Sequence, residues 1–178
     1  MKATVSPSAI DLAYKIFLRQ NWTPEKQSLA KKDPLLSTCV SCGYHNANTA
    51  HIFLDCAVAQ DLWALLNKLT SPTLSFRTNL TPQQILFHQN ISSFSYSSEK
   101  VIIDLIITCK SILHKIAFRD MHLPLINHYS LKALFFKNIL ATIFANRLAE
   151  RQIPIYHSIY EKLIIQYNSN LPISAPSD

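Results

Sequence analysis

Four side chains that commonly bind metal ions stand close together in this chain, and their spacing constrains its fold more than any other feature. They follow the pattern Cys-x2-Cys-x8-His-x4-Cys, as Cys39, Cys42, His51 and Cys56. Three thiolates and one imidazole are the ligands of a closed, tetrahedral structural zinc site. Gly43, the single glycine of the chain, follows the first pair, and glycine adopts positive φ without steric cost. The sequence therefore predicts one structural Zn²⁺, bound by these four residues.

Other interpretations of these residues stay open at this point. A Cys-x-x-Cys pair also occurs in thioredoxin-like redox motifs, but those need a βαβ context that the sequence does not show. Disulfide frameworks belong to small secreted chains, and the N-terminus lacks the apolar core of a signal peptide. His51 and Cys56 can also be core residues of an ordinary helix. His45 is a rival fourth ligand, because it lies three residues beyond Cys42 in a polar loop.

The composition of the whole chain is that of a helical globular protein. Its 178 residues are 48% hydrophobic and 16% charged, which is enough for one domain with a small metal-clipped subdomain. One glycine leaves little scope for glycine-dependent β-turns, and nine prolines separate the periodic segments instead. We therefore predict a mainly α fold, with a small CCHC zinc knuckle embedded in an α-helical array.

The expected organisation has four parts along the chain. Residues 1–70 form a helical lead-in and the zinc-binding module, 71–80 a linker, 81–168 a helical C-terminal region and 169–178 a disordered tail. Thr-Pro pairs at 23–24 and 81–82 predict helix starts, with threonine as the cap and proline at the first helical position. The predicted helices span 8–20, 24–32, 57–69, 82–88, 98–119, 130–152 and 154–168, and Thr49 is expected to cap a short turn that carries His51.

The segment 98–119 is apolar on nearly all sides, which predicts a central helix covered by several neighbours. Its β-branched run also suits a buried strand, but the pattern continues too long without turn signals for a strand. Cys109 lies in this run and is expected to be a small buried thiol. Asp104, Lys110 and Lys115 interrupt the run, so it does not reach the roughly 18–20 apolar residues of a transmembrane helix.

The chain has a moderate positive charge. Seventeen Lys and Arg against eleven Asp and Glu give a formal net charge of +6. This excess is compatible with a polyanionic partner but is common in proteins that bind none. Lys26, Lys31 and Lys32 flank the knuckle and are the candidate phosphate contacts, although a solvated helix face is the favoured interpretation for each of them individually. Trp63 lies among leucines, so we expect it in the core and not as a platform for stacking bases.

No catalytic constellation is visible. The chain has no Asp-Asp pair, no phosphate-cradling glycine loop and no obvious acid–base pair of carboxylates. A Cys-His nucleophile would need Cys109, and nothing in the sequence selects a histidine partner for it. We therefore expect a protein that is not an enzyme and has no small-molecule substrate. Thiolate ligands and a spare thiol fit a reducing intracellular compartment, nucleus or cytoplasm.

Residues 35–66 resemble the zinc-binding C-terminal region of LINE-type (non-LTR) retrotransposon reverse transcriptases. In that family a cysteine pair and a glycine precede Thr-x-His, a hydrophobic pair, a cysteine and a helix with a tryptophan. Ala50 departs from the pattern, since the family often has an acidic residue there, but no ligand is lost. The matching residues are Cys39, Cys42, Gly43, Thr49, His51, Ile52, Phe53, Cys56 and Trp63.

The resemblance implies a fragment of such a reverse transcriptase, without its polymerase and endonuclease domains. In the family this region is thought to hold template RNA or target DNA. The implied partners are therefore RNA or DNA and other parts of the retrotransposon protein, and no membrane partner is implied. The ligand set carries over residue by residue, whereas nucleic-acid contacts do not, because they form no shared motif. The alternatives are a zinc-stabilised structural or protein-interaction domain and a non-functional transposon relic.

Overall fold

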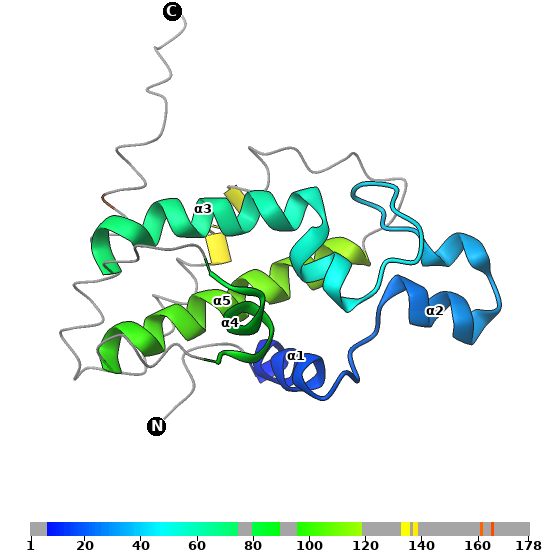
Figure 1. Ribbon diagram of the computed structural model, residues 1–178, viewed down its shortest axis with the longest axis horizontal. Helices are drawn as coiled ribbons and strands as arrows, with labels where there is room; N and C mark the ends of the chain where they lie inside the picture. The colour runs from blue at the N-terminus through cyan, green and yellow to red at the C-terminus, as the bar shows by residue number, and fades with distance from the viewer. Residues whose placement is uncertain are drawn as a thin grey trace, which may run out of the picture.

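The computed structural model describes residues 7–74, 80–89 and 96–118, together with 133–135, 137–138, 161 and 165. These residues are mostly helical and none of them lies in a strand, which confirms the predicted mainly α fold for this part of the chain. The elements in order are α1 (Pro7–Phe17), α2 (Pro24–Lys31), the 3₁₀ helix η1 (Pro34–Ser37), the π-helix η2 (His51–Asp55), α3 (Ala57–Leu74), α4 (Pro82–Phe87) and α5 (Tyr96–Ala117) (Figure 1).

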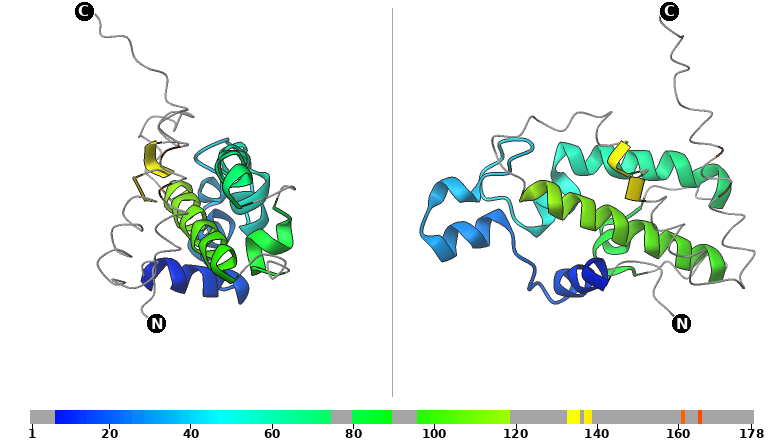
Figure 2. Two further views of the ribbon diagram at one scale, coloured as in Figure 1. Left: turned by 90° about the vertical axis from the view of Figure 1, so that its left-hand side faces the viewer. Right: turned by 180° about the vertical axis from the view of Figure 1, so that it is seen from behind.

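Helix α5 is the central element. It runs beside α3 in the opposite direction, and α1 crosses it on another side, as the views in Figures 1 and 2 show. Its buried side chains point to all sides, which confirms the prediction of a covered helix and excludes the strand. Each fully buried aliphatic side chain contributes roughly 1.5–3 kcal/mol. The buried apolar residues of α5 are Ile102, Leu105, Ile106, Ile107, Cys109, Ile112, Leu113, Ile116 and Ala117.

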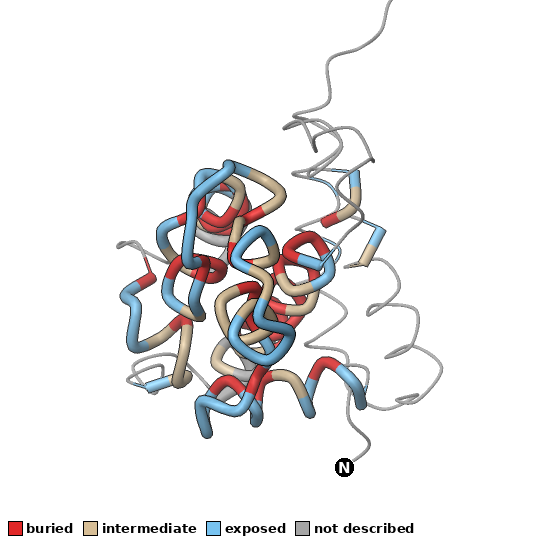
Figure 3. The backbone as a smooth tube through the Cα atoms, turned by 90° about the vertical axis from the view of Figure 1, so that its right-hand side faces the viewer, coloured by how far each residue is buried: buried red, intermediate tan, exposed pale blue. Residues whose placement is uncertain are grey.

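One continuous apolar core connects helices α1, α3 and α5. Ile16 of α1 joins one apolar cluster with Leu62 and Leu66 of α3 and with α5. Figure 3 shows the buried residues on the inner sides of the helices and the exposed ones outside. The buried thiol of Cys109 belongs to this cluster, as predicted, and burial raises its pKa well above the usual value.

The two Thr-Pro helix starts are confirmed. Thr23 accepts a hydrogen bond through Oγ1 from the backbone N–H of Lys26, at 3.2 Å. Thr81 forms a capping box with Gln84, in which each side chain accepts a hydrogen bond from the other residue's backbone N–H. Proline occupies the first helical position in both cases, where its missing N–H costs no helical hydrogen bond.

Several predicted helix boundaries were wrong, and the first is the end of α1, which lies at Phe17, three residues before the predicted residue 20. Helix α3 continues to Leu74 and so takes up the first residues of the predicted 71–80 linker. Pro72 lies in its last turn, where proline removes one backbone hydrogen bond while most of the helix is already formed. Helix α5 begins at Tyr96, two residues before the predicted Ser98. The predicted helices 130–152 and 154–168 fall mostly outside the described residues, and the tail 169–178 falls outside them entirely.

Phe135, from the few described residues near the C-terminus, is fully buried against the α3–α5 core. Among the residues that the structure describes, no helix is both long enough and apolar enough to cross a membrane.

Candidate metal centre

The first two cysteines are placed by a tight turn that follows η1. The backbone N–H of Cys39 donates to the carbonyl of Tyr44, and the N–H of Gly43 donates to the carbonyl of Cys39, both at 2.8 Å. Gly43 has a backbone φ of +75°, a value that residues with a Cβ atom rarely adopt. These bonds fold residues 39–44 back on themselves, so the sulfur atoms of Cys39 and Cys42 come to the same place.

The other two candidate ligands, His51 and Cys56, are placed by the π-helix η2. Its hydrogen bond from the N–H of Cys56 to the carbonyl of His51, at 2.8 Å, closes a turn of five residues. In an α-helix, side chains five residues apart point in directions that differ by roughly 140° around the helix axis, because each residue turns by about 100°. The wider turn brings His51 and Cys56 closer to one side, and π-turns are often found at functional sites.

The cap of this turn differs from the prediction. Thr49 was expected to cap it, but the side chain of Asn48 accepts the hydrogen bond from the N–H of His51, at 3.0 Å. The Thr49 hydroxyl instead donates to Oδ1 of Asn21, at 3.3 Å. The long-range partner explains the difference, because a sequence pattern does not show that Asn21 is within reach.

The four candidate ligand atoms converge. The three sulfur atoms and a ring nitrogen of His51 all lie within 4.8 Å of one another. Sγ of Cys39 is 3.9 Å from Sγ of Cys56, and Sγ of Cys42 is 3.3 Å from Nε2 of His51. A tetrahedral ion with ligand bonds of 2.0–2.3 Å holds its ligand atoms about 3.6–3.8 Å apart. The cluster can therefore hold one metal ion.

His45, the rival fourth ligand, is not part of the cluster. Its ring is exposed, and its Nδ1 lies 3.1 Å from the hydroxyl of Thr38. His51 is buried, and so are Cys39 and Cys56, whereas Cys42 is exposed at the surface of the cluster. The sulfur atoms of Cys39 and Cys56 are also too far apart for a disulfide, whose S–S bond is about 2.05 Å.

The sulfur atoms of Cys39 and Cys56 are within hydrogen-bond distance of each other, and either can be the donor. The pKa of Cys39 is lowered to about 4, chiefly because the Cys56 thiol donates a hydrogen bond to its thiolate. The same hydrogen bond, together with burial, raises the pKa of Cys56. Burial is also the main cause of the raised pKa of Cys42. A divalent cation bound between these sulfurs takes the place of the protons, since thiolates and not thiols are metal ligands.

Two supporting contacts were only partly visible in the sequence. The Tyr44 ring stacks on the His51 imidazole, with centroids 4.4 Å apart and planes 12° apart, which restricts the orientation of the ring. Nothing in the sequence indicates this contact beyond an aromatic residue in the loop. Trp63 is buried, as predicted, and its Nε1 donates to the carbonyl of Phe53 at 2.7 Å, which ties α3 to the back of η2.

The three predicted phosphate-binding lysines do not have equivalent environments. Lys26 donates through Nζ to the backbone carbonyls of Arg19 and Asn21, at 2.7 and 3.0 Å. The Lys26 side chain therefore holds the segment that follows α1, a role that the sequence did not indicate. Lys31 and Lys32 are exposed, and Lys32 ends α2 in the left-handed conformation.

Comparison with protein-family models, with curated proteins and with solved structures finds no match to this chain. What the structure itself supports is thus a helical protein with a Cys₃His cluster that can hold a metal ion.

Proposed function

We propose that Cys39, Cys42, His51 and Cys56 bind one structural Zn²⁺, and that the module they stabilise binds RNA or DNA. The convergence of their four ligand atoms within 4.8 Å carries the first part of this proposal. Three thiolates and one imidazole around a tetrahedral position favour zinc, because zinc takes soft sulfur ligands and four-coordinate geometry. All four positions are supplied by the protein, so the ion is closed to substrate and acts as a cross-link.

In this proposal the ion cross-links two segments that otherwise meet through the Tyr44–His51 stack and a few buried apolar side chains. It links the 39–44 turn to η2, and through η2 to the hydrogen bond between Phe53 and Trp63 of α3. A small subdomain of this kind gains much of its folding free energy from the metal. Removal of the ion is therefore expected to unfold the turn and loosen the connection to α2.

Nucleic-acid binding is supported by the resemblance to retrotransposon reverse transcriptases and by the net charge of +6. Lys31 is the last residue of α2 and Lys32 follows it. Both side chains are exposed to solvent, so phosphate groups can approach them. Each phosphate that a lysine neutralises releases counterions, so such binding weakens steeply with salt. In this proposal the chain corresponds to the zinc-binding part of the family and has no catalytic residues of its own.

Two measurements test the proposal. Metal analysis of the purified protein is expected to give one zinc per chain, and less than half of that in a Cys39→Ser, Cys56→Ser double variant. Fluorescence anisotropy of a labelled structured RNA and a labelled DNA duplex is then measured at several salt concentrations, with zinc-loaded and chelated protein. Zinc-dependent binding with a strong salt slope supports the proposal. One zinc per chain without binding at low salt would restrict it to a structural metal site.

A second candidate function is a zinc-stabilised protein-interaction domain, and helix α1 favours it. Ile10 and Tyr14 lie on one side of this helix and are 40% and 62% exposed, whereas Phe17 on the same side contacts the ring of Phe87, with centroids 6.2 Å apart. An apolar stripe at this spacing ordinarily packs against another element. Co-purification of a stable partner, together with loss of that partner in an Ile10→Ser, Tyr14→Ser variant, would favour this function over nucleic-acid binding.

A further inference from the structure

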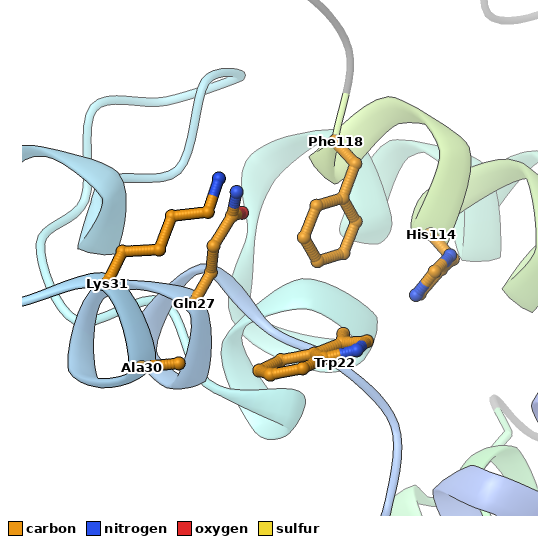
Figure 4. Close-up of a pocket in the computed structure, with 6 residues that line it drawn as sticks. All are labelled: Trp22, Gln27, Ala30, Lys31, His114 and Phe118. Atoms are coloured by element: carbon orange, nitrogen blue, oxygen red, sulfur yellow. The ribbon is translucent and has the colours of Figure 1, made fainter.

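A cavity of about 330 Å³ opens between α2 and the C-terminal end of α5. Its volume falls in the range of small-ligand sites. Figure 4 shows the side chains around it: Trp22 forms the floor, Phe118 stands above the floor, and His114 lies to one side. The ends of Gln27 and Lys31 are turned toward the Phe118 side of the same space. The lining residues are Trp22, Gln27, Ala30, Lys31, His114 and Phe118.

Trp22 is an exposed indole on a fixed backbone. Its side chain is 58% exposed, whereas its neighbours Asn21 and Thr23 are 1% and 0% exposed. Asn21 donates through Nδ2 to the carbonyl of Trp22, at 3.3 Å, and Thr23 caps α2. The backbone that carries the exposed indole is therefore held in place before a partner arrives, so little backbone entropy is lost on binding. The other tryptophan, Trp63, is buried and hydrogen-bonded, so it cannot have this role.

The opposite wall of the cavity is aromatic as well. The rings of His114 and Phe118 contact each other, with centroids 4.9 Å apart and planes tilted by 45°. Burial, and to a lesser extent the charge of Lys15, lowers the pKa of His114, so its imidazole is neutral near pH 7. A flat aromatic group entering the cavity would therefore lie next to three aromatic rings, those of Trp22, His114 and Phe118.

Lysine side chains line both cavities next to Trp22 and His114. Lys31 lines the cavity, and a neighbouring cavity of about 360 Å³ shares Trp22 and His114 and is also lined by Lys15 and Lys115. Lys15 forms an ion pair with Asp11, at 2.7 Å. Lys31 and Lys115 are thus the lysines best placed for an anionic partner whose charges flank a flat ring.

We propose that this cavity takes a base of single-stranded RNA or DNA, stacked on the indole of Trp22 and facing Phe118, with the adjoining phosphates at Lys31 and Lys115. Single-strand binding sites combine a cationic groove with aromatic stacking platforms in this way. Bases in a duplex are stacked on each other and cannot enter. The inference rests on the proposed nucleic-acid binding, and adds the place and the form of the nucleic acid.

The position of Trp22 is tied to the metal centre. The Thr49 hydroxyl donates to Oδ1 of Asn21 at 3.3 Å, and the N–H of Glu25 donates to the carbonyl of Ala47 at 3.2 Å. Ala47 and Thr49 belong to the loop between Cys42 and His51, so the metal-bound loop holds the segment that presents Trp22. Chelation is expected to weaken single-strand binding for this reason, although no metal ligand lines the cavity.

The test uses the full zinc-loaded chain with labelled oligonucleotides of about 12 nucleotides, within the range of known single-strand site sizes. Oligo(U), oligo(dT) and a DNA duplex of the same length are compared by anisotropy, with the variants Trp22→Ala, Trp22→Phe and Leu29→Ala. Leu29 is the matched control, because it is a 74% exposed apolar residue of α2 outside the cavity. We expect Trp22→Ala to weaken single-strand binding by about 5- to 100-fold, and the other two variants to bind like the unchanged protein. Oligo(U) against oligo(dT) distinguishes RNA from DNA.

Tryptophan fluorescence gives a second readout that needs only the unchanged protein and the Trp22→Phe variant. Stacking of a base is expected to quench the emission of the unchanged protein, and the Trp22→Phe variant, which keeps buried Trp63, should show no quenching. Equal binding of duplex and single strand, unchanged affinity in Trp22→Ala, or absence of quenching would each overturn the cavity assignment while leaving nucleic-acid binding in place. If the unchanged protein binds no nucleic acid at any salt concentration, both proposals fail together.

Discussion

Sγ of Cys42 lies 3.3 Å from Nε2 of His51, although one residue stands in an exposed turn and the other begins a buried π-helix. His45 is closer to Cys42 in the chain, yet its ring turns toward Thr38. The choice between the two histidines is made by the π-turn, which directs His51 toward the sulfurs.

The first prediction separates these two histidines. His51→Ala should lower the zinc content of the purified protein well below one per chain, because three thiolates alone leave one position of the tetrahedron open. His45→Ala should keep one zinc per chain. Metal analysis after gel filtration in chelator-treated buffer measures both variants. Equal zinc in the two variants would mean that His51 is not a ligand.

Cys42→Ser gives a test of the cross-link with little change in packing, because Cys42 is the exposed member of the cluster. We expect it to lower the melting temperature by about 10 °C or more, since several kcal/mol of metal-dependent folding free energy are lost. Calorimetry with and without chelator measures this. The difference between variant and unchanged protein should vanish in chelator.

Cys109→Ala is the control for that experiment. Cys109 is fully buried in α5, so its loss leaves a small cavity and lowers stability, but zinc content should remain at one per chain. A zinc content reduced by half in Cys109→Ala would show that the ligand set is wrong.

Gly43 allows the backbone contribution of the turn to be measured by itself. A Cβ at this position would meet no atom within 4 Å, so the cost of a side chain comes only from the φ of +75°. Gly43→Ala should lower the free energy of unfolding by about 1–2 kcal/mol, and Gly43→Asn by less, because asparagine tolerates this region. Urea unfolding at a fixed zinc concentration measures both. An alanine variant as stable as the unchanged protein would mean that a side chain at this position carries no cost from the positive φ.

The sequence predicted the parts of this molecule that depend on local chemistry. The clustering of the four Cys and His side chains, the Thr-Pro helix starts and the covered character of α5 follow from residues that are close in the chain, and all three agree with the structure. The assignment of zinc and the resemblance to retrotransposon proteins stay predictions, because nothing in the fold tests them.

The features that the sequence did not predict depend on contacts between distant residues. The π-form of η2, the hydrogen bonds of Lys26 and the cavity beside Trp22 each need a partner from another element. Lys110 is a further case: in the sequence it is a charge that interrupts an apolar run, whereas in the structure it is fully buried. Periodicity identifies a buried side of a helix, but it does not identify which polar group will meet a lysine there.

The environment of Lys110 gives the last prediction. Its Nζ donates to the carbonyl of Leu86 at 2.8 Å and lies 3.1 Å from Nε2 of His88, so α5 is joined to the end of α4. Burial lowers the pKa of Lys110 to about 7, from an ordinary value of 10.5. Burial and the charge of Lys110 also lower the pKa of His88 to about 4.

Between about pH 7 and pH 10.5 the unfolded chain therefore keeps a proton on Lys110 that the folded chain has lost. Stability should rise with pH across this window, by up to about 1.4 kcal/mol per unit, and the contribution of Lys110 should level off below pH 7, where the residue is protonated in both the folded and the unfolded chain. Urea unfolding of zinc-loaded protein at pH 7, 8 and 9 measures the rise, and Lys110→Met should remove it. Thiol titration in the unfolded chain is common to both proteins, so the difference between their slopes isolates Lys110. Parallel slopes would mean that Lys110 stays protonated in the folded protein, in which case a bound anion or a carboxylate must balance its charge.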